Sequence, residues 1–269
     1  MAAPVRRWLL APEESAEAPH SKASTWRWGV NLLLVALGLA AGFTFAFQQL
    51  HYHWNWSGPW RYRALFWQGW FTTVALAGAS LLVSTTLGVG AALLARSRLL
   101  PARALVRLYV EGIRGTPFLV QILLLFYVVA PAFRLENRLA VGVLALSLFS
   151  GAYITEIIRG GIEGIGKSQW ETARAIGLTR TQTYRHVVLP QALRSILPSL
   201  AGQFVSLIKD SSLLSVIGIG EFALQAQQVN SQTYSTLESY LPLALGYLVL
   251  TLPLSLWTRR LERRAHFDT

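Results

Sequence analysis

The segment Gly161–Ser168 matches the pattern G-x-x-x-x-G-K-[ST] letter for letter. In phosphate-binding loops, this spacing lets backbone N–H groups and a lysine surround the phosphates of a nucleotide. Such a loop follows a buried strand and needs a separate acidic residue to hold magnesium. Here an apolar run ending in Glu156–Arg159 precedes it, and the polar segment around it, roughly 30 residues long, is too small for a nucleotide-binding sheet. We interpret the match as accidental.

The sequence offers little else for covalent or metal chemistry. It contains no cysteine, which excludes disulfides, cysteine zinc sites and a thiol nucleophile. Its five histidines are scattered, without the short spacings among acidic partners that a metal site requires. We therefore predict no catalytic residue and no metal ligand on this chain.

Ionisable side chains inside apolar segments are functional candidates, because a charge in hydrocarbon is unfavourable unless it is paired or used. Glu156 lies near the end of such a segment. A salt bridge to Arg159 or to a partner subunit and a contact with a substrate's amino or cationic group are both open for it. Arg114 could extend to the membrane interface, and Gln121 could bind a substrate or bridge two helices.

Long apolar runs carry these residues. Of the whole chain, 53% is apolar and only 14% is charged, while a helix needs about 20 mostly apolar residues to cross a bilayer. The uncharged runs are Trp28–Phe47, Ala64–Ala95, Gly115–Phe133, Leu139–Thr155 and Ser239–Thr258. A further run, Ser195–Gly220, is interrupted by Lys209 and Asp210, which could form an internal ion pair or contact a gate. We predict an all-α, polytopic membrane protein with about six spans.

The basic residues orient these spans. A net charge of +11 would suit nucleic acid, but 18 of the 24 basic residues fall on one side of the predicted membrane and 5 on the other. The positive-inside rule then places both termini in the cytoplasm, and no nucleic-acid partner is needed to explain the charge. Residues 1–27 are predicted to be a disordered cytoplasmic leader, and residues 28–50 a membrane anchor rather than a cleaved signal.

The segment 159–190 is the long polar stretch between spans. Ser168 and Glu171 fit a capping box, and Gly177 suits a left-handed helix stop. Thr179–Gln182 is expected to open a second helix in the same way, which Pro190 limits. Trp170, Ala173 and Ile176 form an apolar stripe on the first helix, and this helix could contact a soluble partner or lie on the membrane.

Several ordered motifs resemble those of ABC-importer permeases, and more narrowly the polar amino-acid, histidine/glutamine-type group. The run Gln169–Leu178 with Val188–Arg194 resembles the "EAA" signature of these permeases. Further matching segments are Arg114–Pro117, Ala152–Tyr153 with Glu156, Arg159–Ile162, Leu197–Pro198, Gln203–Phe204, Lys209–Asp210 with Ser212–Leu213, and Ser215–Gly218. Thr172 replaces the usual alanine of the signature, and Gly166–Ser168 stands where the group usually has Pro-Lys-Gly, which creates the accidental phosphate-loop pattern.

The resemblance implies a type I importer permease fold. It assigns residues 66–264 to a five-helix permease domain, so that the N-terminal helix is an addition to this core. It makes the helix beginning at Ser168 the coupling helix that sits in a cleft of an ATPase. The expected coupling residues are Ser168, Trp170, Glu171, Ala173, Ile176, Gly177 and Leu178. The expected substrate-pathway residues are Arg114, Thr116, Gln121, Glu156, Gln203, Lys209 and Asp210.

The implied partners are ABC ATPase subunits, a second permease subunit in a homo- or heterodimer, an extracytoplasmic substrate-binding protein and the lipid bilayer. The implied location is the bacterial inner membrane. No cofactor is expected on this chain, because ATP and magnesium would bind the ATPase. Two other functions stay open at this stage: a stand-alone secondary amino-acid transporter, and a membrane-anchored nucleotide-binding enzyme. The polar helix of residues 168–176 argues against the first, since it has no evident role without a soluble partner.

Overall fold

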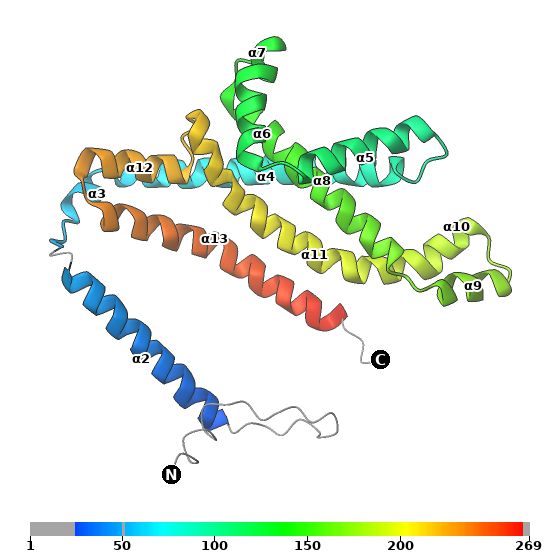
Figure 1. Cartoon of the computed structure of the whole chain (residues 1–269), viewed down its shortest axis with the longest axis horizontal. Coiled ribbons are helices and arrows are strands. Elements are labelled where there is room, and N and C mark those ends of the chain that lie inside the picture. The colour runs from blue at the N-terminus through cyan, green and yellow to red at the C-terminus, as the bar shows by residue number, and fades with distance from the viewer. Residues whose placement is uncertain (1–24, 50–51, 266–269) are drawn as a thin grey trace. The chain divides into compact units, whose positions relative to one another are not determined.

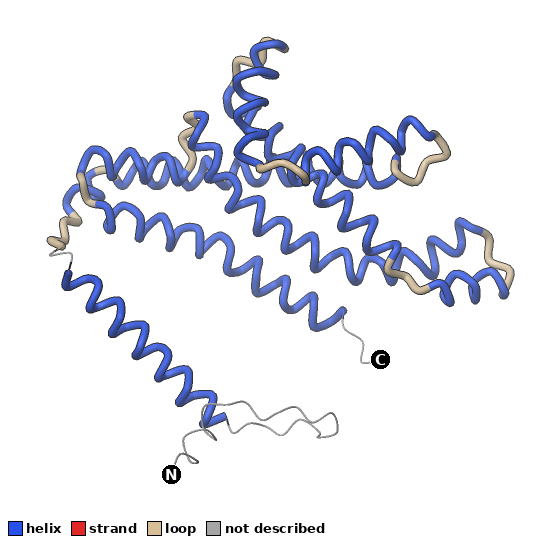
Figure 2. Tube along the Cα trace, viewed as in Figure 1, coloured by secondary structure: helices blue, strands red, loops and turns tan. Residues whose placement is uncertain are grey.

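The computed structural model describes residues 25–49 and 52–265 of the 269-residue chain. The described residues form helices joined by short loops and contain no strand (Figure 2). Contacts divide the chain into two units, Met1–Trp54 and Asn55–Thr269. The prediction of an all-α protein is confirmed.

The first unit contains the helix α2, Thr25–Gln49. Its apolar part, Trp28–Gln49, is long enough to cross a membrane and exposes its side chains on all sides, with 0% of the apolar window buried. A helix that is apolar all round suits a hydrocarbon environment. The helix agrees with the span predicted at 28–50, whereas residues 1–24 of the predicted leader lie outside the described residues.

The second unit holds the remaining helices (Figure 1). Its α-helices are α3 Ser57–Arg61, α4 Arg63–Leu94, α5 Leu100–Arg114, α6 Phe118–Leu124, α7 Ala130–Ala132, α8 Arg138–Glu163, α9 Lys167–Ala175, α10 Arg180–Thr183, α11 Leu189–Asp210, α12 Phe222–Thr233 and α13 Thr236–Ala265. Two π-helical turns, η1 Leu125–Val129 and η2 Tyr184–Val188, and one 3-10 helix, η3 Ser211–Ile217, connect some of these. In Figure 1, α9 and α10 lie at one end of this unit and α3 and α12 at the other, and we call these the α9 end and the α12 end.

The central pair of helices is α4 and α8, which run parallel. Ser147 Oγ donates to Ser80 O at 3.5 Å and Thr155 Oγ1 donates to Gly88 O at 3.3 Å, with the same offset of 67 residues in both pairs. The helices approach closely, because a Cβ on Gly88 would lie 2.5 Å from the side chain of Ile154. Small residues commonly permit such close contacts between membrane helices.

Because α4 and α8 are parallel, the segment between them must carry the chain back to its starting end. This segment is bent by 110° between α5 and α6. The predicted span Gly115–Phe133 begins three residues later than predicted, because Gly115–Pro117 form the break and the helical stretch runs from Phe118 to Ala132. The side-chain amide of Gln121 donates across the break to Ile113 O at 2.6 Å and Thr116 O at 3.0 Å. The described chain has five helices suited to crossing a membrane, or six if the bent pair counts as one span.

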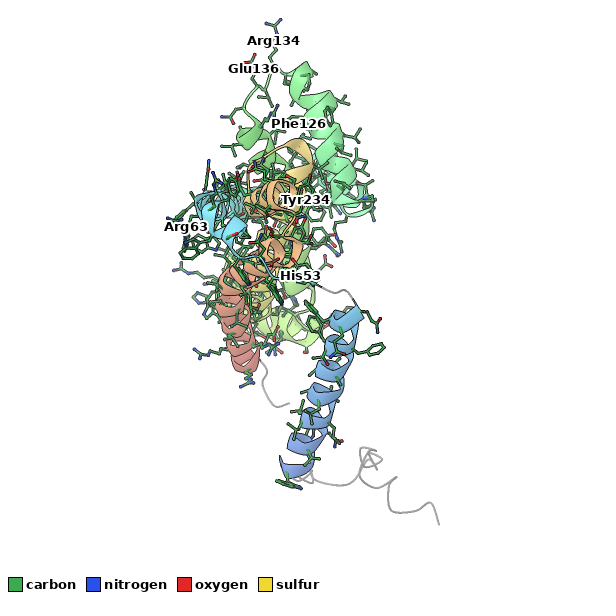
Figure 3. All side chains as sticks on the ribbon, turned by 90° about the vertical axis from the view of Figure 1, so that its left-hand side faces the viewer. His53, Arg63, Phe126, Arg134, Glu136 and Tyr234 are labelled. Carbon is green, nitrogen blue, oxygen red and sulfur yellow. The ribbon has the colours of Figure 1, made fainter. Side chains whose placement is uncertain are left out.

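The turn after α7 closes the bent segment. Arg134 adopts a left-handed conformation with φ of 54°. Arg134 and Glu136 point away from the helices into the surroundings (Figure 3). The guanidinium of Arg138, at the start of α8, lies 6.0 Å from the ring of Phe126 and so ties the returning chain to η1.

The fifth predicted span is longer than expected. Residues Arg180–Ile217 form one continuous helical stretch of 38 residues through α10, η2, α11 and η3. The prediction that Pro190 limits the helix is wrong, because Pro190 lies in the first turn of α11 directly after the π turn η2. In this turn Leu189 N–H donates to Tyr184 O, five residues back, and such widened turns accommodate a proline that has no N–H to donate.

At the α12 end, a fully buried carboxylate fixes α12. Glu221 caps this helix and accepts hydrogen bonds from Ala223 N at 2.8 Å and Leu224 N at 2.7 Å. The hydroxyl of Tyr247 on α13 donates to the same carboxylate at 3.0 Å. Thr73 on α4 accepts from Phe222 N at 3.1 Å, so this cap connects three helices.

Candidate coupling segment and charged cluster

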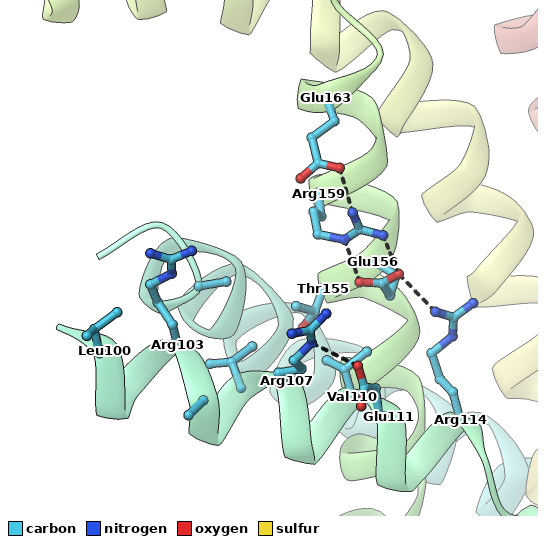
Figure 4. A pocket seen from close by; sticks show the side chains of 13 residues that line it. Leu100, Arg103, Arg107, Val110, Glu111, Arg114, Thr155, Glu156, Arg159 and Glu163 are labelled. Atoms are coloured by element: carbon cyan, nitrogen blue, oxygen red, sulfur yellow. Dashed lines mark hydrogen bonds and ion pairs between the residues drawn. The ribbon is translucent and has the colours of Figure 1, made fainter. Parts of the chain in front are cut away.

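A chain of ion pairs lies near the α9 end of α8 (Figure 4). Glu156 accepts from Arg114 at 2.9 Å and from Arg159 at 2.7 Å, and Arg159 also donates to Glu163 at 2.5 Å. Arg114 is the last residue of α5, and the other three residues lie one turn apart on α8. The structure thus brings together Arg114 and Glu156, two of the predicted pathway residues, and shows the salt bridge to Arg159 that was one of the alternatives left open for Glu156.

Two cavities border the charged cluster. A cavity of about 720 Å³ is lined by Arg114, Glu156 and Glu163 between α5 and α8. A second cavity, of about 740 Å³, lies between α8 and α11 and is lined by Glu156 and Gln191. The side chain of Glu156 is 22% exposed, whereas Arg114 and Arg159 are about twice as open at 42% and 48%. Glu156 therefore lies in the wall between two cavities and is shared by two long, partly exposed side chains.

The other predicted pathway residues are spread along the unit. Thr116 Oγ1 accepts from the amide of Gln121 at 2.9 Å, so both residues hold the break between α5 and α6. The amide of Gln203 on α11 donates to Ser150 Oγ on α8 at 3.3 Å, which bridges two helices. Lys209 and Asp210 end α11 and make no ion pair with each other within the described residues.

The predicted coupling helix is α9. Its beginning differs from the prediction, whereas its end agrees with it. Gly166 is the N-cap residue and no side chain caps the helix, so the predicted capping box of Ser168 and Glu171 is wrong. The helix begins one residue before Ser168, which places Ser168 inside the first turn. The predicted stop at Gly177 is confirmed: its φ is 80°, and Gly177 N and Leu178 N donate to Arg174 O and Ala173 O at 2.9 and 3.0 Å.

The next helix begins as predicted. Thr179 and Gln182 form a complete capping box at the start of α10. The ring of Tyr184, in η2, packs edge-on against the ring of Trp170 at 5.2 Å, and Gln191 donates to Gln169 at 3.3 Å. These contacts hold α9 against the start of the long helix.

The three apolar side chains of the α9 stripe differ in how far they are buried. Ala173 is 2% exposed and Trp170 is half-buried, so both face the chain itself. Ile176 is 69% exposed, and Ser168 and Glu171 are also exposed. The stripe was predicted as one surface, but only its last residue is left uncovered.

The residues that match the phosphate-loop pattern do not have the geometry of a phosphate-binding loop. Gly161 and Glu163 belong to the last turn of α8, where Gly161 lies against Ile196 on α11. No strand precedes this segment in the described part of the chain. The interpretation of the match as accidental agrees with this arrangement.

Sequence reasoning missed two acidic residues. The spacing of Glu156, Arg159 and Glu163 at three and four residues is typical of helical ion pairs and could have revealed Glu163. Glu221 had no comparable signal beyond its position before the uncharged helix Phe222–Thr233, and its burial depends on Tyr247, which is distant in the sequence.

The comparisons with known proteins agree with one another on the family of this chain. Residues 84–267 match the family described as "Binding-protein-dependent transport system inner membrane component". The chain is 37% identical over 203 residues to the probable glutamine ABC transporter permease protein GlnM of Bacillus subtilis, covering 75% of this chain and 93% of that protein. It is 42% identical over 159 residues to the glutamine transport system permease protein GlnP of Escherichia coli, covering 58% of this chain and 72% of that protein.

A solved structure of an amino acid ABC transporter with histidines superimposes with a TM-score of 0.73 at 36% identity, covering 79% of this chain and 100% of the other. The fold is thus the type I importer permease fold, and of the three functions left open by the sequence, the family favours the permease over the secondary transporter and the nucleotide-binding enzyme. The chain belongs to the family of inner membrane permease components of binding-protein-dependent ABC transport systems.

Proposed function

We propose that this chain imports a polar amino acid as the permease subunit of an ATP-driven transporter, and that α9 transmits the motion of a partner ATPase to the spans. The observation that carries the coupling role is the construction of α9. It is a short, exposed helix that ends at a glycine stop and is held at its base by Trp170 and Gln169. Such a helix can be pushed as one body, and its exposed Glu171 and Ile176 offer a contact.

The family supports the proposed assembly without specifying its members. Two permease subunits, as a homo- or heterodimer, would join two ATPase subunits and an extracytoplasmic binding protein. ATP and Mg²⁺ would bind the ATPase subunits, and both termini of this chain would lie in the cytoplasm, as its distribution of basic residues favours. Closure of the ATPase dimer would move α9, and the spans would alternate between inward-facing and outward-facing states.

The charged cluster supports a zwitterionic substrate. An amino acid carries an ammonium and a carboxylate, and Glu156 and Arg114 offer the complementary pair at a distance of 2.9 Å from each other. Glu156 also borders both cavities. Relatives named as glutamine, cystine and arginine permeases agree with this class of substrate.

The coupling role is tested by combining Glu171→Ala with Gly177→Val. A valine is strained at a φ of 80°, which destabilises the left-handed stop by roughly 1–2 kcal/mol, and loss of Glu171 removes the exposed carboxylate. We expect uptake by the reconstituted complex to fall at least about tenfold while ATP hydrolysis persists. Gly78→Val is the matched control, because the space around Gly78 in α4 is open. Normal uptake by the double variant would refute the assignment of α9.

A further inference from the structure

Next to the charged cluster, arginines from four different elements converge on one small cleft. It has a volume of about 310 Å³ and is lined by Arg96 after α4, Arg103 on α5, Arg159 on α8 and Arg180 on α10. We call it the arginine cleft. The positive-inside rule explains why arginines occur on this side of the membrane, but it does not require them to meet at one point.

In the part of the chain that the structure describes, carboxylates do not neutralise the positive charge of the cleft. Arg159 is paired with Glu156 and Glu163, and Glu163 is the single carboxylate in the lining. Within the described residues, no ion pair or side-chain hydrogen bond involves Arg96, Arg103 or Arg180. Figure 4 shows Arg103 beside the paired residues without any interaction to them. All three of these arginines are exposed, and an anion bound between them would lower the free energy of placing like charges around one cleft.

The remaining lining indicates what kind of anion fits. Ala92, Ala95 and Ile158 form an apolar wall, and the hydroxyl-bearing Ser97 and Tyr184 complete the cleft. Guanidinium groups bind phosphate oxygens in a bidentate manner, and basic pockets between membrane helices bind phospholipid head groups. An apolar wall beside a basic one matches the junction between a phosphate and its glycerol and acyl groups.

The depth of the cleft agrees with this ligand. Arg96 lies two residues beyond the end of α4, an apolar helix of 32 residues, and Arg159 lies one turn beyond Glu156 near the end of α8. These positions correspond to the boundary of the hydrocarbon, where head groups are found. From these observations, we propose that the arginine cleft binds the phosphate group of an anionic ligand, supplied by a phospholipid head group or by soluble phosphate.

The cleft also has a place in the mechanism. Its Tyr184 is the residue whose ring supports Trp170 of α9, and Arg180 belongs to α10. A bound phosphate would therefore join α4 and α5 to the base of the coupling segment. This inference does not depend on which substrate is carried, and it would stand if α9 had another role.

The test uses the full-length chain purified in a neutral detergent. Its thermal unfolding is followed while phosphatidylglycerol is added, with phosphatidylcholine as the neutral lipid, and in separate samples with sodium phosphate against sodium chloride at equal ionic strength. We expect phosphatidylglycerol to raise Tm and phosphatidylcholine to have no such effect. A rise with sodium phosphate alone would identify soluble phosphate as the source.

The role of the arginines is tested by the triple variant Arg96→Gln/Arg103→Gln/Arg180→Gln. Since each arginine near a charged membrane surface contributes roughly fivefold in affinity, the half-maximal anion concentration should rise on the order of 100-fold. The matched control is Arg98→Gln/Arg259→Gln/Arg260→Gln, which removes the same charge from residues that are likewise exposed but lie outside the cleft. The control should respond as the unchanged chain does.

The triple variant Arg96→Lys/Arg103→Lys/Arg180→Lys shows whether a loss of binding comes from a folding defect. It keeps the charge and loses the bidentate geometry, so it should fold and bind with intermediate affinity. Equal responses of the cleft variant and the control variant would overturn the proposal, because the arginines would then act only as an orientation signal. Absence of any anion effect on the unchanged chain would overturn it as well and would leave the cleft to a protein partner.

Discussion

The two ends of the second unit both contain carboxylates within the helix bundle, but they hold them in opposite ways. At the α12 end, Glu221 is 0% exposed and accepts from the N–H groups of the helix that it caps. At the α9 end, Glu156 is partly exposed and lies between two cavities, and among the described residues it accepts only from the long side chains of Arg114 and Arg159.

The difference concerns freedom of movement. A carboxylate bound to backbone N–H groups is fixed to its helix, and its partners cannot move without unwinding the first turn. An arginine can leave a carboxylate by changing rotamers, and the neighbouring cavities give it room to do so. We infer that the α12 end is a rigid anchor and that the α9 end is the place where charges can exchange partners during transport.

The largest effect that separates the two ends is expected for Glu221→Ala. This change removes the cap of α12 and leaves the partly buried hydroxyl of Tyr247 without this acceptor, which together should destabilise the fold by roughly 2–4 kcal/mol and lower Tm by about 5–15 °C. Glu163→Ala is the comparison at the α9 end. Its side chain is 52% exposed, so the loss should be below about 1 kcal/mol. Similar losses of Tm in the two variants would contradict a rigid anchor at the α12 end.

The next effect is on transport rather than on stability. Glu156→Gln keeps the shape of the side chain and removes the charge shared by two arginines, so Tm should change little because both arginines are exposed to water. Loss of a charge-assisted hydrogen bond should raise the substrate concentration for half-maximal stimulation of ATP hydrolysis by about tenfold or more.

Glu163→Gln is the matched control for this measurement. Glu163 pairs with the same Arg159 but does not line the cavity between α8 and α11. Its half-maximal substrate concentration should stay unchanged. If Glu156→Gln also leaves this concentration unchanged, Glu156 has a structural role only and does not contact the substrate.

The contrast between the ends also explains how much the sequence could predict. The α9 end is built from local patterns: the three- and four-residue spacing on α8, the capping box at Thr179 and the left-handed stop at Gly177 can all be found along the chain. The prediction of a capping box at Ser168 was wrong because Gly166, two residues earlier, is the N-cap residue of α9. Local signals place a helix within a residue or two, and tertiary contacts decide the rest.

Prolines illustrate the limit more sharply. Pro117 lies in the break between α5 and α6, where the chain bends by 110°, whereas Pro190 lies within a continuous helical stretch directly after a π turn. Pro131 in α7 also follows a π turn, η1. A widened turn has no signature in residue type, so the sequence analysis treated Pro190 as the end of a helix. The buried Glu221 was equally hidden, since its partners Thr73 and Tyr247 lie on helices that are distant in the sequence.

The smallest predicted effect is a pH dependence that arises at the α12 end. Burial raises the pKa of Glu221 above its ordinary value, although the N–H groups of Ala223 and Leu224 act in the opposite direction. A carboxyl whose pKa is higher in the folded state than in the unfolded state binds more protons when folded. Its contribution to stability is therefore complete below the unfolded pKa and declines as the pH rises towards the folded pKa.

Thermal unfolding of the full-length chain at pH values from about 5 to 8 should accordingly show a Tm that falls with rising pH. Glu221→Gln cannot titrate and should flatten this part of the profile, while Glu163→Gln, at the exposed α9 end, should keep it. An unchanged slope in Glu221→Gln would mean that another group titrates in this range. The carboxylate at the α12 end would then be held in its charged form by the two N–H groups, which outweigh its burial.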